Sequence, residues 1–414
     1  MKSIRINSQS GAVSLFVVIF ATLLITVVTV SFLRLMISDQ NRATGNDLSQ
    51  SAYDSAQAGV EDAKRVLLRY QKICTENGQS ACDTLANQIS TADCNEALRI
   101  GDVIGSGDVT TGGGGQTGEI KIQQTSSVGD ATLDQAYTCV TIKLLTDDYL
   151  GSLSVGESKL VPLIAKGDDG STVFDTVTVE WFSTEDIGKA ASGLYDVSLT
   201  GLPQSGQSQP LFTSWPANRP SILRTQLMQF GSGFTLGDFD ATNSSSESNA
   251  NTVFLYPTSG VSGSSQFIAR DQRQKDASGN IPQKQSADTP LSVNCVASLT
   301  SGGYACSQTL VLPQPISGGD RTAFLRLTPY YNATHFRVTM SRGSIAVKFN
   351  GVQPEIDSTG RANDLFRRIS SRVDLVDTSF PYPDGAVDVT GNLCKDFSVT
   401  NTAYIPPSGG SCTP

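Results

Sequence analysis

The apolar and polar positions of this chain divide it into a helical N-terminal part and a β-rich remainder. From Ala12 to Leu33 no charged residue appears. A helix of that length rises about 33 Å, enough to cross the hydrocarbon core of a bilayer, which is about 30 Å thick. Charged and amide side chains return from Arg34 onward. The sequence therefore predicts a membrane-spanning helix over residues 12–36.

The next thirty residues continue the helical pattern in an amphipathic form. Proline is absent from Gln40 to Gln71, and small or apolar residues recur at steps of three and four: Leu48, Ala52, Ser55, Gly59, Ala63, Val66 and Tyr70. This spacing places them on one helix face. We expect a single helix over residues 12–71, whose second half packs beneath a globular head. Gly45 and Asn46 form the point where a bend would cost least.

Beyond Tyr70 the pattern changes to short alternating runs rich in β-branched residues, which are typical of antiparallel strands. We expect such strands over 119–125, 136–146, 158–166 and 173–182, and again over 221–230, 252–257, 322–331, 335–340, 344–349 and 365–376. A stretch rich in Pro, Gly, Ser and Gln separates the two groups. The predicted organisation is α+β: a long helix on a first β-rich head region (72–198), a linker or long loop (199–220), and a second β-rich region (221–414).

The eight cysteines indicate disulfides rather than a metal site. None forms a CxxC pair, and an even count in an exported chain favours an oxidising compartment. Eight cysteines permit about 105 connectivities. Pairing between sequence neighbours would give Cys74–Cys82, Cys94–Cys139, Cys295–Cys306 and Cys394–Cys412, of which the third and fourth are the better supported because they are local.

Composition and charge exclude several functions. The formal net charge of −9 argues against a generic nucleic-acid binder, because no positive field collects phosphates. The single histidine, His335, removes most zinc sites and His-dependent triads; we expect it to be a strand residue with a satisfied ring nitrogen. No catalytic motif is visible, so we expect no enzyme, cofactor or metal site.

Two charged or polar stretches are ambiguous. The stretch around Thr242 and Asn243 fails the calcium-loop pattern. We interpret Arg367, Arg368 and Arg372 as solvated faces paired with nearby aspartates, with a partner contact or an anionic polymer as the alternative.

The N-terminal segments carry a family resemblance. A short basic leader ends in Gly11, the apolar helix starts at Ala12, and "SAYDSAQAGVEDAKR" follows at Ser51–Arg65. Together these resemble type IV pilin precursors, and more closely the minor pilins of the PilX type. The resemblance implies that prepilin peptidase removes residues 1–11 by cutting between Gly11 and Ala12 on the cytoplasmic side. Lys2 and Arg5 would hold this leader inside.

The same resemblance implies a role. Major pilins usually carry a glutamate at the position that Phe16 occupies here, so the implied subunit is a minor one that acts in filament priming, at the tip, or in adhesion. Its partners would be other pilins, prepilin peptidase, the membrane, and a surface ligand or host cell. The head would lie outside the cell, and the Cys394–Cys412 loop would match the disulfide-bounded C-terminal loop of pilins. The helix residues expected to mediate membrane contact and assembly are Leu15, Phe16, Val17, Ile19, Phe20, Leu23 and Leu24.

Two other classes remain open at this point. One is a membrane-anchored extracellular adhesive or binding protein that never enters a filament. The other is a pseudopilin-like secretion component, for which calcium in the head would be expected.

Overall fold

The computed structural model describes residues 10–104, 118–122, 134–167, 172–188, 194–199, 215–231, 250–259, 265–266, 291–299, 302–316 and 321–375. The chain forms two compact units, each built from two pieces of sequence. The first unit contains residues 1–142 and 356–371, and the second contains residues 143–355 and 372–414. Two long strands, β2 (Gln135–Thr146) and β16 (Ile345–Ala362), each contribute to both units.

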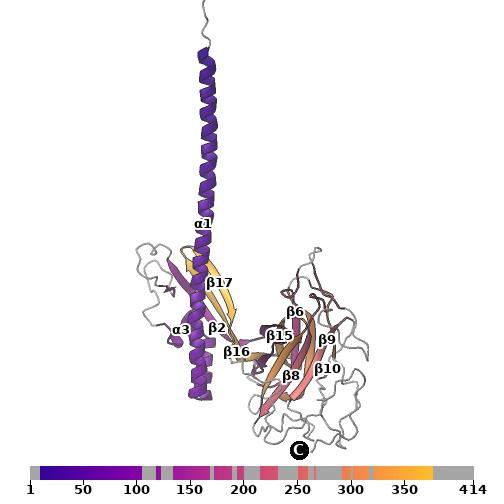
Figure 1. Cartoon of the computed structure of the whole chain (residues 1–414). Helices are drawn as coiled ribbons and strands as arrows, with labels where there is room; N and C mark the ends of the chain where they lie inside the picture. The colour runs from indigo at the N-terminus through magenta and orange to yellow at the C-terminus, as the bar shows by residue number, and fades with distance from the viewer. Residues whose placement is uncertain are drawn as a thin grey trace, which may run out of the picture. The chain divides into compact units, whose positions relative to one another are not determined.

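The first unit is a long helix packed against a small sheet (Figure 1). The helix α1 spans Ser10–Glu76. Its sheet has the order β1 (Ile120–Lys121), β2, β16 and β17 (Leu365–Arg372), with β1 antiparallel to β2. The stripe expected from the sequence is the buried face: Ala52, Ser55, Gly59, Ala63, Val66 and Tyr70 are buried, while Leu48 is half-buried. Figure 1 shows β2, β16 and β17 across the C-terminal half of α1.

The helix is longer than expected and has no break at Gly45, where a bend would cost least. It begins before Ala12 and ends beyond Gln71, at Glu76. It passes through Gly45 without interruption. Gly78, with φ of +82°, then reverses the chain, a backbone conformation that glycine adopts at no steric cost.

Two short helices occupy the start of the region that the sequence predicts to be β-rich (72–198). They are α2 (Gln79–Ser90) and α3 (Glu96–Ile100). Leu85 and Ile89 of α2 and Leu98 of α3 are buried. Cys82 and Ala97 are also buried, but buried positions in two such short helices span too few turns to give a strong periodic signal, which is why the pattern did not reveal them.

The second unit contains strands of two sheets, the first of which continues through β16 the ten-stranded sheet that also includes β1, β2 and β17. One has the order β16, β15 (Thr334–Arg342), β6 (Phe174–Ser183), β13 (Tyr304–Ile316) and β10 (Ser265–Gln266), with β3 (Tyr149–Leu153) paired to β15 and β5 (Ala165–Lys166) paired to β16. The other has the order β11 (Leu291–Asn294), β9 (Ala250–Thr258), β8 (Ile222–Gly231), β14 (Arg321–Tyr330) and β4 (Lys159–Pro162). Both sheets are mixed, because β10 runs parallel to β13 in the first and β11 runs parallel to β9 in the second. A further pair joins β7 (Tyr195–Asp196) to β12 (Ser298–Leu299).

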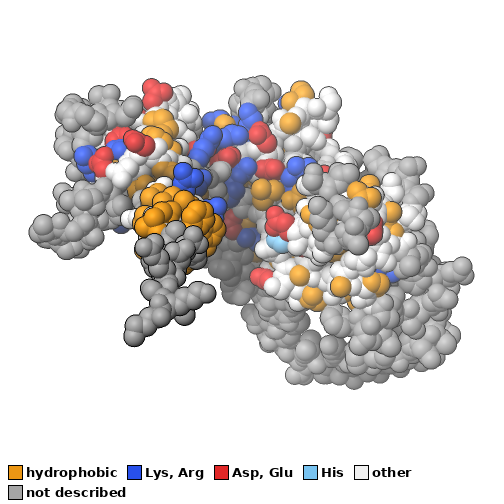
Figure 2. Space-filling view, turned by 90° about the horizontal axis from the view of Figure 1, so that it is seen from above, with side chains coloured by type: hydrophobic (Ala, Val, Ile, Leu, Met, Phe, Trp, Pro, Cys, Tyr) orange, Lys and Arg blue, Asp and Glu red, His pale blue; other side chains and the backbone are white. Residues whose placement is uncertain are grey.

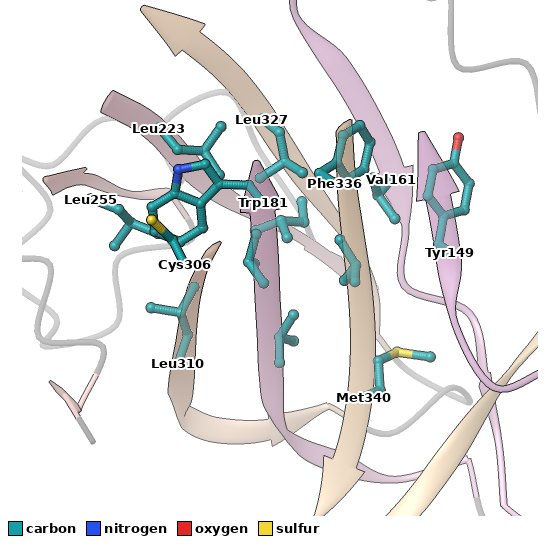
Figure 3. Packing of buried hydrophobic residues seen from close by; sticks show 14 of the residues in the cluster. Tyr149, Val161, Trp181, Leu223, Leu255, Cys306, Leu310, Leu327, Phe336 and Met340 are labelled. Carbon is teal, nitrogen blue, oxygen red and sulfur yellow. The ribbon is translucent and has the colours of Figure 1, made fainter. Parts of the chain in front are cut away.

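These two sheets share one hydrophobic core. Figure 3 shows Trp181 of β6 among Leu223, Leu255 and Leu327, which lie on β8, β9 and β14 of the other sheet. Cys306 lies beside Trp181. Trp181 is fully buried, and its indole Nε1 donates a 3.0 Å hydrogen bond to the carbonyl oxygen of Ser221. On β15, burial alternates strictly from Thr334 to Met340, as the apolar pattern predicts.

The structure corrects two parts of the predicted organisation. The division into regions 72–198 and 221–414 does not match the two units, because β2 and β16 carry the chain through both. In addition, the end of the expected linker, at 215–220, is packed. Trp215 and Arg219 are buried, Trp215 stacks on Tyr331 at 4.3 Å, and the guanidinium of Arg219 lies 4.1 Å from the indole ring. Proline and glycine signals do not register such aromatic and cation–π packing.

Candidate functional site

The N-terminal half of α1 is an uncovered apolar surface. Every large hydrophobic side chain from Leu15 to Ile37 is exposed, from 47% for Val28 to 75% for Phe16. Figure 2, which looks along the helix, shows these side chains as one apolar mass. Within the described part of the chain, α1 is the one helix long and apolar enough to cross a membrane. A free apolar surface of this size is typical of a segment that contacts lipid or other proteins.

The hydroxyl groups in this surface are satisfied within the helix itself. Thr22 donates to the carbonyl oxygen of Ile19 at 2.9 Å, and Thr26 to that of Leu23 at 2.8 Å. Thr29 and Ser31 make the same kind of bond at 2.8 Å. Because an unpaired hydroxyl is costly in an apolar medium, this internal bonding lets the surface leave water.

The residues predicted for this surface lie as follows. Leu15, Phe16, Val17, Ile19, Phe20, Leu23 and Leu24 are all exposed on α1. Gly11 and Ala12 lie at the start of the helix, which begins at Ser10. Their role as the processing site stays a prediction.

The C-terminal half of α1 is fixed to the sheet of the first unit by close contacts. A Cβ at Gly59 would lie 2.5 Å from Ser358 Oγ and 2.8 Å from Val140 Cγ2. The Ser358 hydroxyl donates a 2.7 Å hydrogen bond to the carbonyl oxygen of Ala56. The hydroxyl of Tyr137 donates to Asp62 at 2.7 Å. The exposed half of the helix is therefore continuous with a half that is held by small residues and hydrogen bonds.

Three disulfides stabilise the two units, and they match pairings expected from neighbouring cysteines. Cys74–Cys82 joins α1 to α2, and Cys94–Cys139 joins the turn before α3 to β2. Cys295–Cys306 joins two neighbouring antiparallel segments of the second unit. The fourth expected pair, Cys394–Cys412, lies outside the described residues.

A cavity of about 420 Å³ opens in the second unit. Its lining includes glycines and hydroxyl side chains together with the functional groups of Glu185, Tyr304 and His335. Burial raises the pKa of Tyr304 to about 12. In the described part of the chain, no group of three or more His, Cys, Asp or Glu side chains is arranged to hold a metal ion.

His335 is a strand residue with a satisfied ring nitrogen, as expected. Its Nδ1 lies 2.7 Å from Oδ1 of Asp186, and its Nε2 lies 3.2 Å from Oε2 of Glu185. Sequence reasoning did not find these two carboxylates, because the turn that carries them is 149 residues away from His335. Only the antiparallel pairing of β15 with β6 brings them together.

Of the three arginines near the C-terminus of the described chain, Arg368 and Arg372 pair with acids, and Arg367 binds a serine hydroxyl. Arg368 binds Asp357 on the neighbouring strand β16. Arg372 lies 3.1 Å from Asp148, and Arg367 donates to Ser49 of α1 at 2.8 Å. Cross-strand and helix–strand neighbours provide these partners, not the acids close in sequence.

No protein-family model, characterised protein or solved structure matches this chain. Its class is therefore defined by architecture alone. An N-terminal hydrophobic helix on a β-sheet head with disulfides is a pilin-like architecture. The candidate membrane span and the disulfides also indicate a membrane or extracellular protein.

Proposed function

We propose that this protein is a minor type IV pilin that acts in priming, at the tip, or in adhesion of a surface filament. The observation that carries the proposal is the division of α1 into two halves. One continuous helix is exposed and apolar in its first half and packed against a sheet in its second half. That arrangement suits a subunit that is first held by a membrane and then by neighbouring helices.

The proposed mechanism is an exchange of apolar surroundings. In the membrane, the segment from Ala12 to Leu33 contacts lipid tails. In the filament it contacts the same segments of other subunits, so van der Waals packing replaces lipid contacts. The internally bonded threonines need no new partner in either state. The head stays in solvent throughout.

The size of the head supports a minor rather than a bulk role. Beyond the strands that cover α1, the chain builds a second unit with a separate five-stranded sheet and its own core. A subunit repeated along the whole filament has no need of such a unit, whereas a subunit at a tip or a contact point does. Phe16, in place of a charged residue, also fits this role.

Expression with and without a prepilin peptidase tests the proposal. We expect the mature N-terminus to be Ala12 when the peptidase is present and Met1 when it is absent. Gly11→Leu should block the cut, whereas Gly45→Ala, a change at a glycine farther along the helix with nothing within 4 Å of its Cβ position, should leave it unaffected. An intact Met1 in the presence of the peptidase, or a cut beyond Leu33, would contradict the proposal.

A membrane-anchored surface protein that never assembles is the second candidate, because lipid alone would also cover the exposed half of α1. Shearing of cells distinguishes the two. A minor pilin should appear with the sheared filaments and depend on the other pilins for release. An anchored protein should stay entirely with the membrane fraction.

A further inference from the structure

The turn after β6 holds a carboxylate against the only histidine of the chain. Asp186 is almost fully buried, with 6% of its side chain exposed. Its carboxylate accepts hydrogen bonds from the backbone N–H of Ser183 at 2.7 Å and from that of His335 at 2.9 Å. The same group lies 2.7 Å from His335 Nδ1. A buried carboxylate in this position accepts a hydrogen bond from Nδ1–H, and this fixes the ring orientation.

Nε2 therefore points away from Asp186, toward the cavity that His335 and Glu185 both line. Glu185 Oε2 lies 3.2 Å from Nε2. In the neutral ring with its proton on Nδ1, Nε2 is a lone-pair acceptor, and so is the carboxylate. Two acceptors at this distance need a cation or a proton between them.

We propose that His335 Nε2 and Glu185 bind a divalent transition metal ion of the zinc type at the mouth of this cavity. Zinc binds imidazole nitrogen and carboxylate oxygen at about 2.0–2.2 Å in tetrahedral geometry, which places two such ligands about 3.3–3.5 Å apart. The observed 3.2 Å separation is close to that value. Asp186 is a positioning residue, since metal-binding histidines commonly donate their other ring N–H to a carboxylate.

The chemistry of the two ligands selects the metal. Calcium and magnesium prefer oxygen ligands alone, whereas imidazole suits zinc, copper and nickel. The protein provides two ligands, so water in the open cavity completes the coordination. A site of this kind binds weakly compared with a structural zinc site, and it keeps positions open for a ligand atom from another molecule.

The turn that carries Glu185 is already ordered for this role. The backbone N–H of Glu185 donates to Ser183 Oγ at 3.1 Å. The N–H of Asp186 donates to the carbonyl oxygen of Ser183 at 3.1 Å. The Glu185 side chain itself is 74% exposed, so it can adjust to a metal without disturbing the core. A proton on Nε2, with the imidazolium held between two carboxylates, is the competing occupant.

Zinc titration of the full chain, without an affinity tag and in detergent micelles, tests the proposal. Because the chain has one histidine, ring-¹⁵N histidine labelling reports on this site alone. We expect zinc to shift the Nε2 resonance while Nδ1 keeps its proton, and calorimetry to give one ion per chain. Calcium should leave the ring signals unchanged.

Variants locate the ion. Glu185→Gln and His335→Gln should each weaken zinc binding at least tenfold. Asp147→Asn, which removes another exposed carboxylate of the second unit, is the control and should leave it unchanged. Because Glu185 is exposed, E185Q should fold even if H335Q does not. Ring signals insensitive to zinc, or unchanged zinc affinity in E185Q, would overturn the proposal and leave the proton as the occupant. Neither result bears on the N-terminal cut or on filament release.

Discussion

Gly360 of β16 lies directly against the backbone of α1 at Ala52. A Cβ at Gly360 would come within 2.2 Å of the Ala52 carbonyl oxygen and within 2.2 Å of the Ala56 amide nitrogen. The obstacle is main chain of a helix, which cannot rotate away as a side chain can. The helix and the sheet of the first unit are thus in contact at the closest distance that their backbones allow.

Gly360→Ala should therefore separate α1 from its sheet. We expect a loss of about 3 kcal/mol in the free energy of unfolding, at the upper end of the usual cost of overpacking. Thermal unfolding of the full chain in detergent micelles measures it. Gly45→Ala is the matched control, because nothing lies within 4 Å of its Cβ position and it sits mid-helix. It should stabilise the helix by about 0.5–1 kcal/mol. Equal effects of the two changes would contradict this packing.

The ion pair between Arg361 and Glu119 connects β16 to the residue before β1. Arg361 Nη2 lies 2.7 Å from Glu119 Oε2, and the Glu119 side chain is only 1% exposed. Arg361→Met would leave this carboxylate buried without its main partner, which we expect to cost about 3–5 kcal/mol. Arg65→Met, which breaks the more exposed pair with Asp62, should cost less than about 1 kcal/mol. Adding Glu119→Gln to Arg361→Met should recover part of the loss.

The sequence predicted the helix and most strands because their buried faces are apolar. The strand positions of β2, β6, β8, β14 and β15 agree with the expected segments to within a residue or two. The second half of β16 was missed for a physical reason. Its residues that face α1 are Ser358, Gly360 and Ala362, which are buried yet not strongly apolar. Small residues at alternating positions give no hydropathy signal. They are nevertheless what the close contact between β16 and the backbone of α1 requires.

The candidate sites also differ in how far local sequence reveals them. The exposed half of α1 could be predicted because it is an uninterrupted run of apolar residues. The group formed by His335, Asp186 and Glu185 could not, since one chain reversal and one strand pairing create it. The pattern at His335 predicted a satisfied ring nitrogen, and no local signal identified the carboxylate that satisfies it.

The two disulfides of the first unit should contribute unequally to stability. The pairs close loops with sequence separations of 45 for Cys94–Cys139 and 8 for Cys74–Cys82. In the chain-entropy model, closing these loops stabilises the folded state by about 4 kcal/mol for Cys94–Cys139 and about 2.5 kcal/mol for Cys74–Cys82. The double variant Cys94→Ser with Cys139→Ser should therefore lower the unfolding temperature more than Cys74→Ser with Cys82→Ser. Thermal unfolding of both variants measures the difference, and the opposite order would contradict the expectation.

Tyr304 should make the second unit sensitive to alkali. Burial raises the pKa of its phenol to about 12, from 10.0 in the unfolded chain. Between these values the unfolded chain releases the proton and the folded chain keeps it. The stability that Tyr304 provides is thus complete below pH 10 and is lost as the pH rises toward 12. The unfolding temperature should fall less between pH 9 and 11 in Tyr304→Phe than in the natural chain. Tyr53→Phe, at an exposed position on α1, is the control for loss of one phenol.

The exposed half of α1 should tolerate no charge if it enters a membrane. Leu24→Arg places a guanidinium near the centre of the expected span, which costs about 2.5–3.5 kcal/mol for insertion. Leu68→Arg is a matched control, because Leu68 lies on the same helix and is 63% exposed, against 55% for Leu24. We expect Leu24→Arg to reduce the fraction that resists alkaline extraction from membranes several-fold, while Leu68→Arg leaves it unchanged. Equal extraction of both variants would mean that α1 is held by something other than lipid.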